Sequence, residues 1–369
     1  MSDRLKALFN DYGQSPWLDN LKRSYITSGE LMGIRNSGIR GLTSNPTIFQ
    51  KAIQGSEDYS EQFTALVNQK LSPIDCYWQL VLRDINSALE IFEPLYESSS
   101  GLDGFVSVEV DPSLAHEQSK TLLAARELDE QIKRPNVMIK IPATVEGVPV
   151  IKTMISEGRN VNVTLIFSLE RYQEVINAYI EGLEILATTN PKSVASVSSV
   201  ASFFISRVDT EIDRQLEQVG SDQANGLLGT AAINQAKLAY QMFKKSFTGP
   251  RWSKLAQLGA NVQRPLWAST STKNPKYRDT IYVDSLIGEH TVNTLPDTTV
   301  EAFSDHGSLS STIETNLDMA NSQWADLKTV GVNVSEVAEK LEREGVASFQ
   351  KSFDDLLVAL SAKTAELLK

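Results

Sequence analysis

One lysine, Lys140, interrupts an otherwise apolar run that extends from Val137 to Pro142. The apolar residues around it predict a short buried strand. Burying an ammonium group is costly unless the group is paired or loses its proton. A neutral lysine amine is a nucleophile that forms a Schiff base with a ketone. The alternative is that Lys140 lies at a strand end and extends its amine to solvent. The surroundings of the lysine must decide between the two.

Polar side chains also recur near the carboxyl ends of other predicted strands. Alternate residues of a strand point to opposite faces, so Glu109 lies opposite Val108 and Val110. Any one such residue is readily explained as a hydrogen-bonded strand end, but several together with a lysine favour an active site. The polar group comprises Asp19, Thr43, Asn45, Glu109, Asn162 and Thr164.

These residue types suit the cleavage of a carbon–carbon bond beside a ketone. An iminium on Lys140 would act as an electron sink and hold the product carbanion as an enamine. Asp19 and Glu109 can serve as the general base and the relay for a positioned water. Asn45, Asn162, Thr164 and Ser202 suit the hydroxyls of a polyol. Arg207 follows a strand, where it could bind a terminal phosphate or form a surface ion pair.

Eight short apolar segments alternate with amphipathic ones along the chain. This alternation predicts an α/β fold, a single (β/α)₈ TIM barrel over residues 1–369, with helical insertions near 46–100 and 208–262 and a helical C-terminus over 335–368. A doubly wound open sheet is the alternative, but the chain has no G-x-G-x-x-G or P-loop motif. The predicted strands are Ser15–Asp19, Gly38–Ser44, Phe105–Val110, Asn136–Ile141, Asn160–Ile166, Val197–Ile205, Arg264–Ser269 and Thr291–Thr294.

Composition narrows the class of protein. A net charge of -11 argues against nucleic acid or an anionic membrane as a main partner. The single cysteine, Cys76, excludes an internal disulfide and favours the cytoplasm. The segment Met1–Asn10 reads as a short amphipathic helix without the apolar core of a signal peptide. The three histidines lack metal-ligand spacing, so we expect no metal. Exposed apolar helices would allow a homodimer.

Several segments, taken in order, resemble the transaldolase family. The match extends from Ser15 to about Thr298, and the blocks together are highly specific although no single one would suffice. The matching blocks are Trp17–Asp19, Gly41–Phe49, Val106–Asp111, Met138–Thr144, Asn162–Ser168 and Ser202–Arg207.

The resemblance implies a pentose-phosphate-pathway enzyme that transfers a dihydroxyacetone unit from sedoheptulose 7-phosphate or fructose 6-phosphate to glyceraldehyde 3-phosphate or erythrose 4-phosphate. By this analogy Lys140 forms the Schiff base, Asp19 is the acid/base, and Glu109 and Thr164 hold the catalytic water. The analogy further implies that Asn45 and Asn162 form hydrogen bonds with the substrate's hydroxyls. It also implies that Ser202 and Phe204 line the pocket and that Arg207 binds the phosphate.

One block departs from the pattern of shorter transaldolases, which follow the seventh strand with Ala-Ser-x-Arg. Here the stretch Ala268–Pro275 has no arginine at that place and is similar to the longer bacterial branch. In place of that arginine, Ser269, Ser271 and Lys273 could together bind the phosphate, with the lysine acting as a point charge.

Two other functions are compatible with parts of this pattern. A sugar-phosphate aldolase would use the same Schiff base but release free dihydroxyacetone. A non-catalytic sugar-phosphate-binding barrel would explain the fold, but a pure binding protein has no use for a buried amine nucleophile beside two carboxylates. The chemistry of the residues and the family resemblance favour the transferase.

Overall fold

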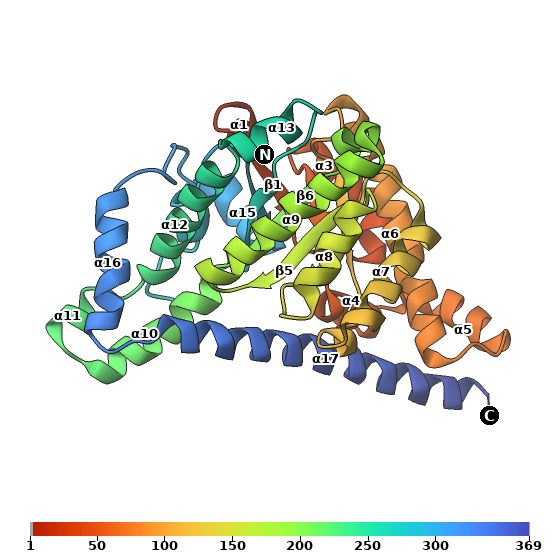
Figure 1. Ribbon diagram of the computed structural model, residues 1–369. Coiled ribbons are helices and arrows are strands. Elements are labelled where there is room, and N and C mark those ends of the chain that lie inside the picture. Colours follow the sequence, from red (N-terminus) through yellow and green to blue (C-terminus); the bar gives the residue numbers. More distant parts are fainter. Residues whose placement is uncertain (1–2, 369) are drawn as a thin grey trace.

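Eight parallel strands close into a barrel in the computed structural model, which describes residues 3–368 (Figure 1). Each strand pairs with the next, and β8 pairs with β1. The closed sheet confirms the predicted (β/α)₈ fold and excludes the doubly wound open sheet. The strands are β1 (Gln14–Leu18), β2 (Gly41–Thr43), β3 (Phe105–Glu109), β4 (Val137–Pro142), β5 (Val161–Ile166), β6 (Ser199–Phe204), β7 (Arg264–Ala268) and β8 (Thr291–Leu295).

The predicted and observed strands differ most at β2, for which the sequence pattern predicts a start at Gly38 and the structure has a start at Gly41. Gly38 has a φ of +122°, and its N–H donates to the Arg35 carbonyl at the end of a helix. This backbone conformation is a turn that only glycine adopts readily. The chain therefore enters the barrel three residues later than the apolar pattern suggests.

Helices surround the barrel and supply additional layers at its ends (Figure 1). The helical C-terminus is confirmed. The helix predicted over Met1–Asn10 is present from Arg4, with Asp3 as its N-cap, and Met1 and Ser2 lie outside the described residues. In residues 3–368 no helix combines the length and apolarity that a membrane span requires. The helices are α1 (Arg4–Asn10), α2 (Arg23–Thr27), α3 (Glu30–Asn36), α4 (Pro46–Gln54), η1 (Glu57–Tyr59), α5 (Ser60–Asn68), α6 (Pro73–Ser98), η2 (Pro112–Leu114), α7 (Gln118–Ile132), α8 (Gly147–Ser156), α9 (Leu169–Thr189), η3 (Pro191–Ser196), α10 (Ser206–Val219), α11 (Asp222–Asn225), α12 (Ala231–Ser246), α13 (Pro250–Ala256), α14 (Ile281–Asp284), α15 (Asp297–His306), α16 (Leu317–Thr329) and α17 (Val334–Leu367).

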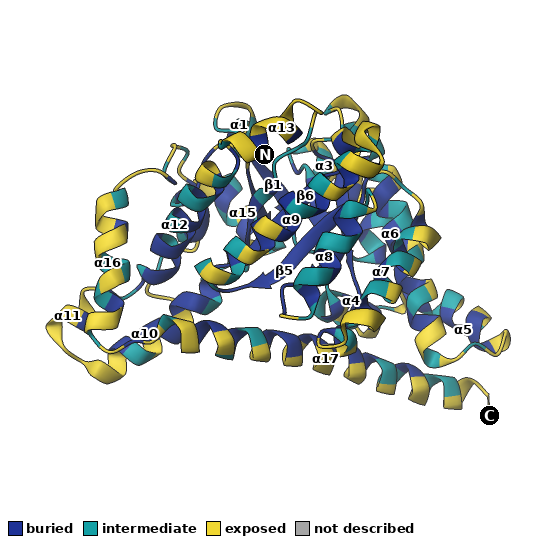
Figure 2. Cartoon of the chain, in the orientation of Figure 1, coloured by how far each residue is buried: buried dark blue, intermediate teal, exposed yellow. Residues whose placement is uncertain are grey.

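The long helix α17 crosses one end of the barrel and packs against α4, α6 and α10. Its buried residues face the barrel and its exposed residues face away (Figure 2). At Gly345 the helix approaches Leu165 so closely that an added Cβ would lie 2.9 Å from the leucine Cδ2. The glycine thus lets α17 lie directly over the end of β5.

The opposite end of the barrel is closed by ion pairs around Asp103, which is fully buried. Its carboxylate accepts hydrogen bonds from Arg40 Nε at 2.6 Å, Ser15 Oγ at 2.9 Å and Arg264 Nη2 at 3.1 Å. Two guanidinium groups compensate the buried charge, as a buried carboxylate requires.

Trp17 packs inside the barrel between these two ends. Its ring lies 6.3 Å from that of Phe105, which is two strands away, so the two rings meet across the interior. The neighbouring strand makes room with Gly41, where an added Cβ would lie 2.5 Å from Trp17 Cε2. Because Trp17 is fully buried in a close-packed interior, its ring cannot move aside at low cost.

We expect Gly41→Ala to lower the free energy of unfolding by about 1–3 kcal/mol, since the new methyl group overpacks the barrel against Trp17. Gly33→Ala is the matched control, because an added Cβ there meets no atom within 4 Å on helix α3. That control should be neutral or stabilise by about 0.5–1 kcal/mol. Urea denaturation of both variants measures the difference, and equal effects would contradict the packing argument.

Candidate active site

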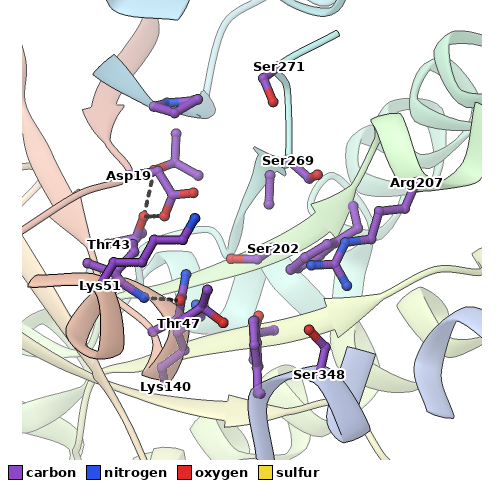
Figure 3. Close-up of a pocket in the computed structure, with 18 of the residues that line it drawn as sticks. Asp19, Thr43, Thr47, Lys51, Lys140, Ser202, Arg207, Ser269, Ser271 and Ser348 are labelled. Atoms are coloured by element: carbon purple, nitrogen blue, oxygen red, sulfur yellow. Dashed lines mark hydrogen bonds between the residues drawn. The ribbon is translucent and has the colours of Figure 1, made fainter. Parts of the chain in front are cut away.

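A cavity of about 310 Å³ lies at the carboxyl ends of the strands, between the barrel and α17 (Figure 3). Ten of the twelve predicted site residues line it. They are Asp19, Asn45, Lys140, Thr164, Ser202, Phe204, Arg207, Ser269, Ser271 and Lys273. Glu109 and Asn162, the other two, are buried and do not line it.

Lys140 and Glu109 occupy register positions opposite each other on β4 and β3. Lys140 Nζ lies 3.3 Å from Glu109 Oε2 and donates to the Ser44 carbonyl at 3.2 Å. Both residues are buried, with 4% and 6% of their surface exposed. Lys140 therefore does not extend to solvent. Burial raises the pKa of Glu109, and the lysine charge offsets part of that rise.

Asp19 follows β1 directly, and its backbone N–H donates to the Leu295 carbonyl of β8 at 2.8 Å. Thr43 Oγ1 donates to the Asp19 carboxylate at 2.8 Å and lies 2.6 Å from Thr294 Oγ1. These contacts fix the carboxylate at the cavity wall. Desolvation raises the pKa of Asp19, and the opposing effects of Lys140, Thr43 and Arg207 lower it again in part.

Thr164 projects into the cavity beside a bulge in β5. The register with β6 shifts between Val163 and Ile166, and Leu165 has a φ of +60°, which is strained for a leucine. The Thr164 hydroxyl is buried and has no hydrogen-bond partner among the described residues. An unpartnered hydroxyl at a cavity wall is available to a water molecule or a substrate.

Asn162 forms a buried hydrogen-bond chain instead of reaching the cavity. Its Nδ2 donates to Ser107 Oγ at 2.9 Å, and its Oδ1 accepts from Ser202 Oγ at 2.7 Å. Only Ser202 of this chain lines the cavity. Asn45 lines the cavity as well, and its Oδ1 accepts from the Ile48 N–H as the N-cap of α4.

Positive charge gathers at the other end of the cavity. Arg207 lies at the start of α10, 5.3 Å from the centroid of the Phe204 ring. Lys273 Nζ donates to Ser271 Oγ at 2.6 Å. Desolvation and the nearby Arg207 charge lower the pKa of Lys273. The two cations and the hydroxyls of Ser269 and Ser271 make this end suitable for an anion.

The cavity also has lining residues that the sequence did not indicate. Lys51, from α4, points into it (Figure 3), and its charge also acts on Lys273. Phe349, from α17, lies with its ring centroid 5.7 Å from Lys140 Nζ. No local pattern in α17 singles out Phe349, whereas Thr294 at the end of β8 follows the same rule as the predicted residues. The additional residues are Thr47, Ile48, Lys51, Ala268, Thr294, Pro296, Ser348 and Phe349, and Thr43 of the polar strand-end group lines the cavity as well.

A metal centre has no support in the described residues. Between residues 3 and 368 no three His, Cys, Asp or Glu side chains gather closely enough to hold an ion. The cavity offers the Lys140 amine, the Asp19 carboxylate, several hydroxyls and the three cations Lys51, Arg207 and Lys273. This set can do covalent amine chemistry on an anionic, hydroxyl-rich carbonyl compound.

The Lys140–Glu109 pair yields a prediction about stability. Lys140→Met leaves the Glu109 carboxylate buried and unpaired, so we expect the free energy of unfolding to fall by about 3–5 kcal/mol at neutral pH. The loss should shrink as the pH falls, because a protonated Glu109 needs no partner and its folded pKa lies above the usual 4.5. The double variant Lys140→Met/Glu109→Gln should recover much of the loss in urea denaturation. A double variant no more stable than the single one would contradict the pairing argument.

Comparisons with known proteins agree with this geometry. The model of the transaldolase/fructose-6-phosphate aldolase family matches residues 16–360. The chain is 47% identical over 347 residues to a transaldolase of Parafrankia sp. (strain EAN1pec), covering 94% of each chain. It is 46% identical over 353 residues to transaldolase 1 of Streptomyces coelicolor, covering 95% of this chain and 92% of the relative. A transaldolase of Trichodesmium erythraeum is 45% identical over 366 residues, with 96% of each chain covered. The chain therefore belongs to the transaldolase/fructose-6-phosphate aldolase family.

Proposed function

We propose that this chain is a transaldolase of the pentose phosphate pathway, acting in the cytoplasm. It transfers a dihydroxyacetone unit from sedoheptulose 7-phosphate or fructose 6-phosphate to glyceraldehyde 3-phosphate or erythrose 4-phosphate. The observation that carries the proposal is a buried Lys140 amine, paired with Glu109, in a cavity that also holds a carboxylate and a cationic end.

In the first step Lys140 gives a proton to Glu109, and the amine attacks the ketone carbon of the donor. The same proton then returns to the hydroxyl of the carbinolamine, which leaves as water, and a protonated iminium results. Glu109 lies 3.3 Å from Lys140 Nζ, and Thr164, whose hydroxyl has no partner among the described residues, lines the cavity. In our proposal this pair holds the water that carries protons to and from the nitrogen.

Asp19 takes the proton of the substrate hydroxyl beside the bond that breaks. The carbon–carbon bond then cleaves, the electron pair moves into the iminium to give an enamine, and the first aldose phosphate leaves. The acceptor aldehyde enters, the enamine attacks it, and Asp19 returns the proton to the new hydroxyl. Water then adds to the new iminium and hydrolyses it, which releases the product ketose phosphate and regenerates Lys140. Because burial raises the pKa of Asp19, the carboxylate is a stronger base than an exposed aspartate and can both accept and return this proton.

The cationic end of the cavity would hold the phosphate of donor and acceptor. Arg207 and Lys273 supply the charge, and Ser269 and Ser271 supply hydroxyl donors. Asn45 and Ser202, on the walls between the two ends, suit the intervening hydroxyls. The same lining also fits an aldolase, which the family description includes; the named relatives support transfer.

Borohydride reduction in the presence of fructose 6-phosphate tests the proposal. We expect an adduct of dihydroxyacetone on the peptide that contains Lys140, and transfer to erythrose 4-phosphate that exceeds release of free dihydroxyacetone. Lys237→Met is a matched control, because Lys237 on α12 is another buried lysine, its Nζ donates to the Thr315 carbonyl, and it does not line the cavity. It should keep the adduct, whereas Lys140→Met should lose it. An adduct elsewhere would refute the assignment, and release without dependence on an acceptor would favour the aldolase.

The pH dependence of cleavage tests Asp19. The base must be ionised, and burial raises its pKa above the usual 3.8, so turnover should rise with pH through a limb placed above that of an exposed aspartate. Asp19→Asn should slow cleavage by about 10²- to 10⁴-fold and abolish this limb. If the pH–rate profiles of the wild-type chain and Asp19→Asn have the same acid limb, Asp19 is not the general base.

A further inference from the structure

Two buried carboxylates on α10 lie outside the cavity and take no part in the chemistry proposed above. Asp209 and Asp213 are one helical turn apart, and 1% and 7% of their surface is exposed. Residues at this spacing lie on the same helix face. A buried carboxylate must be satisfied by hydrogen bonds or charges, so its partners show what the helix face contacts.

The two carboxylates have the same kind of partners. Asp209 accepts from the Ala232 N–H at 2.7 Å and from the Tyr282 hydroxyl at 2.8 Å. Asp213 accepts from the Gly229 N–H at 2.9 Å and from the Tyr277 hydroxyl at 2.7 Å. Each carboxylate therefore joins the backbone at or just before the start of α12 to the segment 269–284 that follows β7.

The backbone at Gly229 is shaped for the Tyr277 ring. Gly229 has a φ of +70°, and an added Cβ would lie 2.7 Å from Tyr277 Cζ. A side chain at this position would both strain the backbone and displace the ring. The ring position is therefore set by two independent features, the hydrogen bond to Asp213 and the close approach to Gly229.

The two elements that these hydrogen bonds join, α10 and the segment 269–284, each carry a residue of the cationic end of the cavity. Helix α10 begins at Ser206 and bears Arg207, and the segment 269–284 bears Lys273. The Ser206 N–H donates to the Ser269 carbonyl at 3.1 Å, so the two elements also meet at the cavity. Arg207 and Lys273 repel each other, and the loop that carries Lys273 is exposed. Without a tether, repulsion would favour separation of the loop from the helix.

We propose that the pairs Asp209–Tyr282 and Asp213–Tyr277 form a clamp that sets the distance between Arg207 and Lys273 and thereby the affinity for phosphorylated substrates. Tyr277 and Tyr282 are positioning residues, because they act through the loop. The clamp rests on the proposed function, since it deepens the role of the cationic end.

Tyr277→Phe tests the clamp because it removes one hydroxyl and keeps the ring. We expect the KM for fructose 6-phosphate to rise about 3- to 10-fold, as expected for one lost hydrogen bond, with kcat within about twofold. Turnover of unphosphorylated fructose should keep its KM. Gly229→Ala should raise the same KM with the Tyr277 hydroxyl intact.

Tyr179→Phe is the matched control. Tyr179 is a buried tyrosine on α9 whose hydroxyl donates to the Asn261 carbonyl at 2.6 Å, away from the cavity. Its loss should leave every KM unchanged. If Tyr277→Phe leaves the KM for fructose 6-phosphate unchanged, or raises it equally for fructose, the clamp is wrong.

Binding of inorganic phosphate by calorimetry separates the clamp from the proposed function. Weaker phosphate binding by Tyr277→Phe than by Tyr179→Phe supports the clamp even if the wild-type chain shows no transfer, an outcome that would refute only the transaldolase proposal. Equal binding by the two variants overturns the clamp whatever the turnover.

Discussion

The burial of one ion pair at the bottom of the cavity constrains the rest of the site. Lys140 and Glu109 come from adjacent strands at matching register, so a shift of either strand by one residue would turn one of them to the helices. The barrel must be closed and its register fixed before the pair can form. The Ser44 carbonyl and the Phe349 ring then complete the surroundings of the ammonium group. A buried pair of this kind adds little to stability, and its retention in the cavity fits a chemical role.

Charge is arranged along the cavity in a definite order. The Lys140–Glu109 pair lies at one end, Arg207 and Lys273 lie at the other, and Asp19 interacts with both Lys140 and Arg207. An anionic substrate is therefore drawn to the cationic end, which directs its uncharged end toward Lys140. The charges of Lys140 and Arg207 lower the pKa of Asp19 against the effect of burial, so a phosphate-binding cation also acts on the group that transfers the proton.

The strands and their polar ends could be predicted because both follow from a period of two residues. Lys140, Thr164 and Asp19 lie where alternation and strand ends place them. Asn162 shows the limit of that reasoning, since alternation predicts which face of the sheet a side chain lies on but not whether it reaches the cavity. Hydrogen bonds with Ser107 and Ser202 hold the Asn162 side chain below the cavity. Phe349 lies more than 200 residues from Lys140 in sequence, and only the packing of α17 brings it near. Acidic residues such as Asp209 resemble a solvated helix face until their tyrosine partners are known.

The reacting groups of the site lie on barrel strands, whereas its phosphate-binding cations lie on a helix start and a loop. The two sets should therefore respond differently to mutation. Lys140, Glu109 and Thr164 stand on strands of a closed sheet, where neighbours on both sides fix each backbone. Arg207 and Lys273 stand on a helix start and an exposed loop, where a few side-chain contacts fix their separation. Small changes outside the barrel can therefore alter the affinity for phosphate and leave the positions of the reacting groups unchanged. Changes within the barrel interior must disturb both, because α10 and the loop after β7 continue directly from its strands.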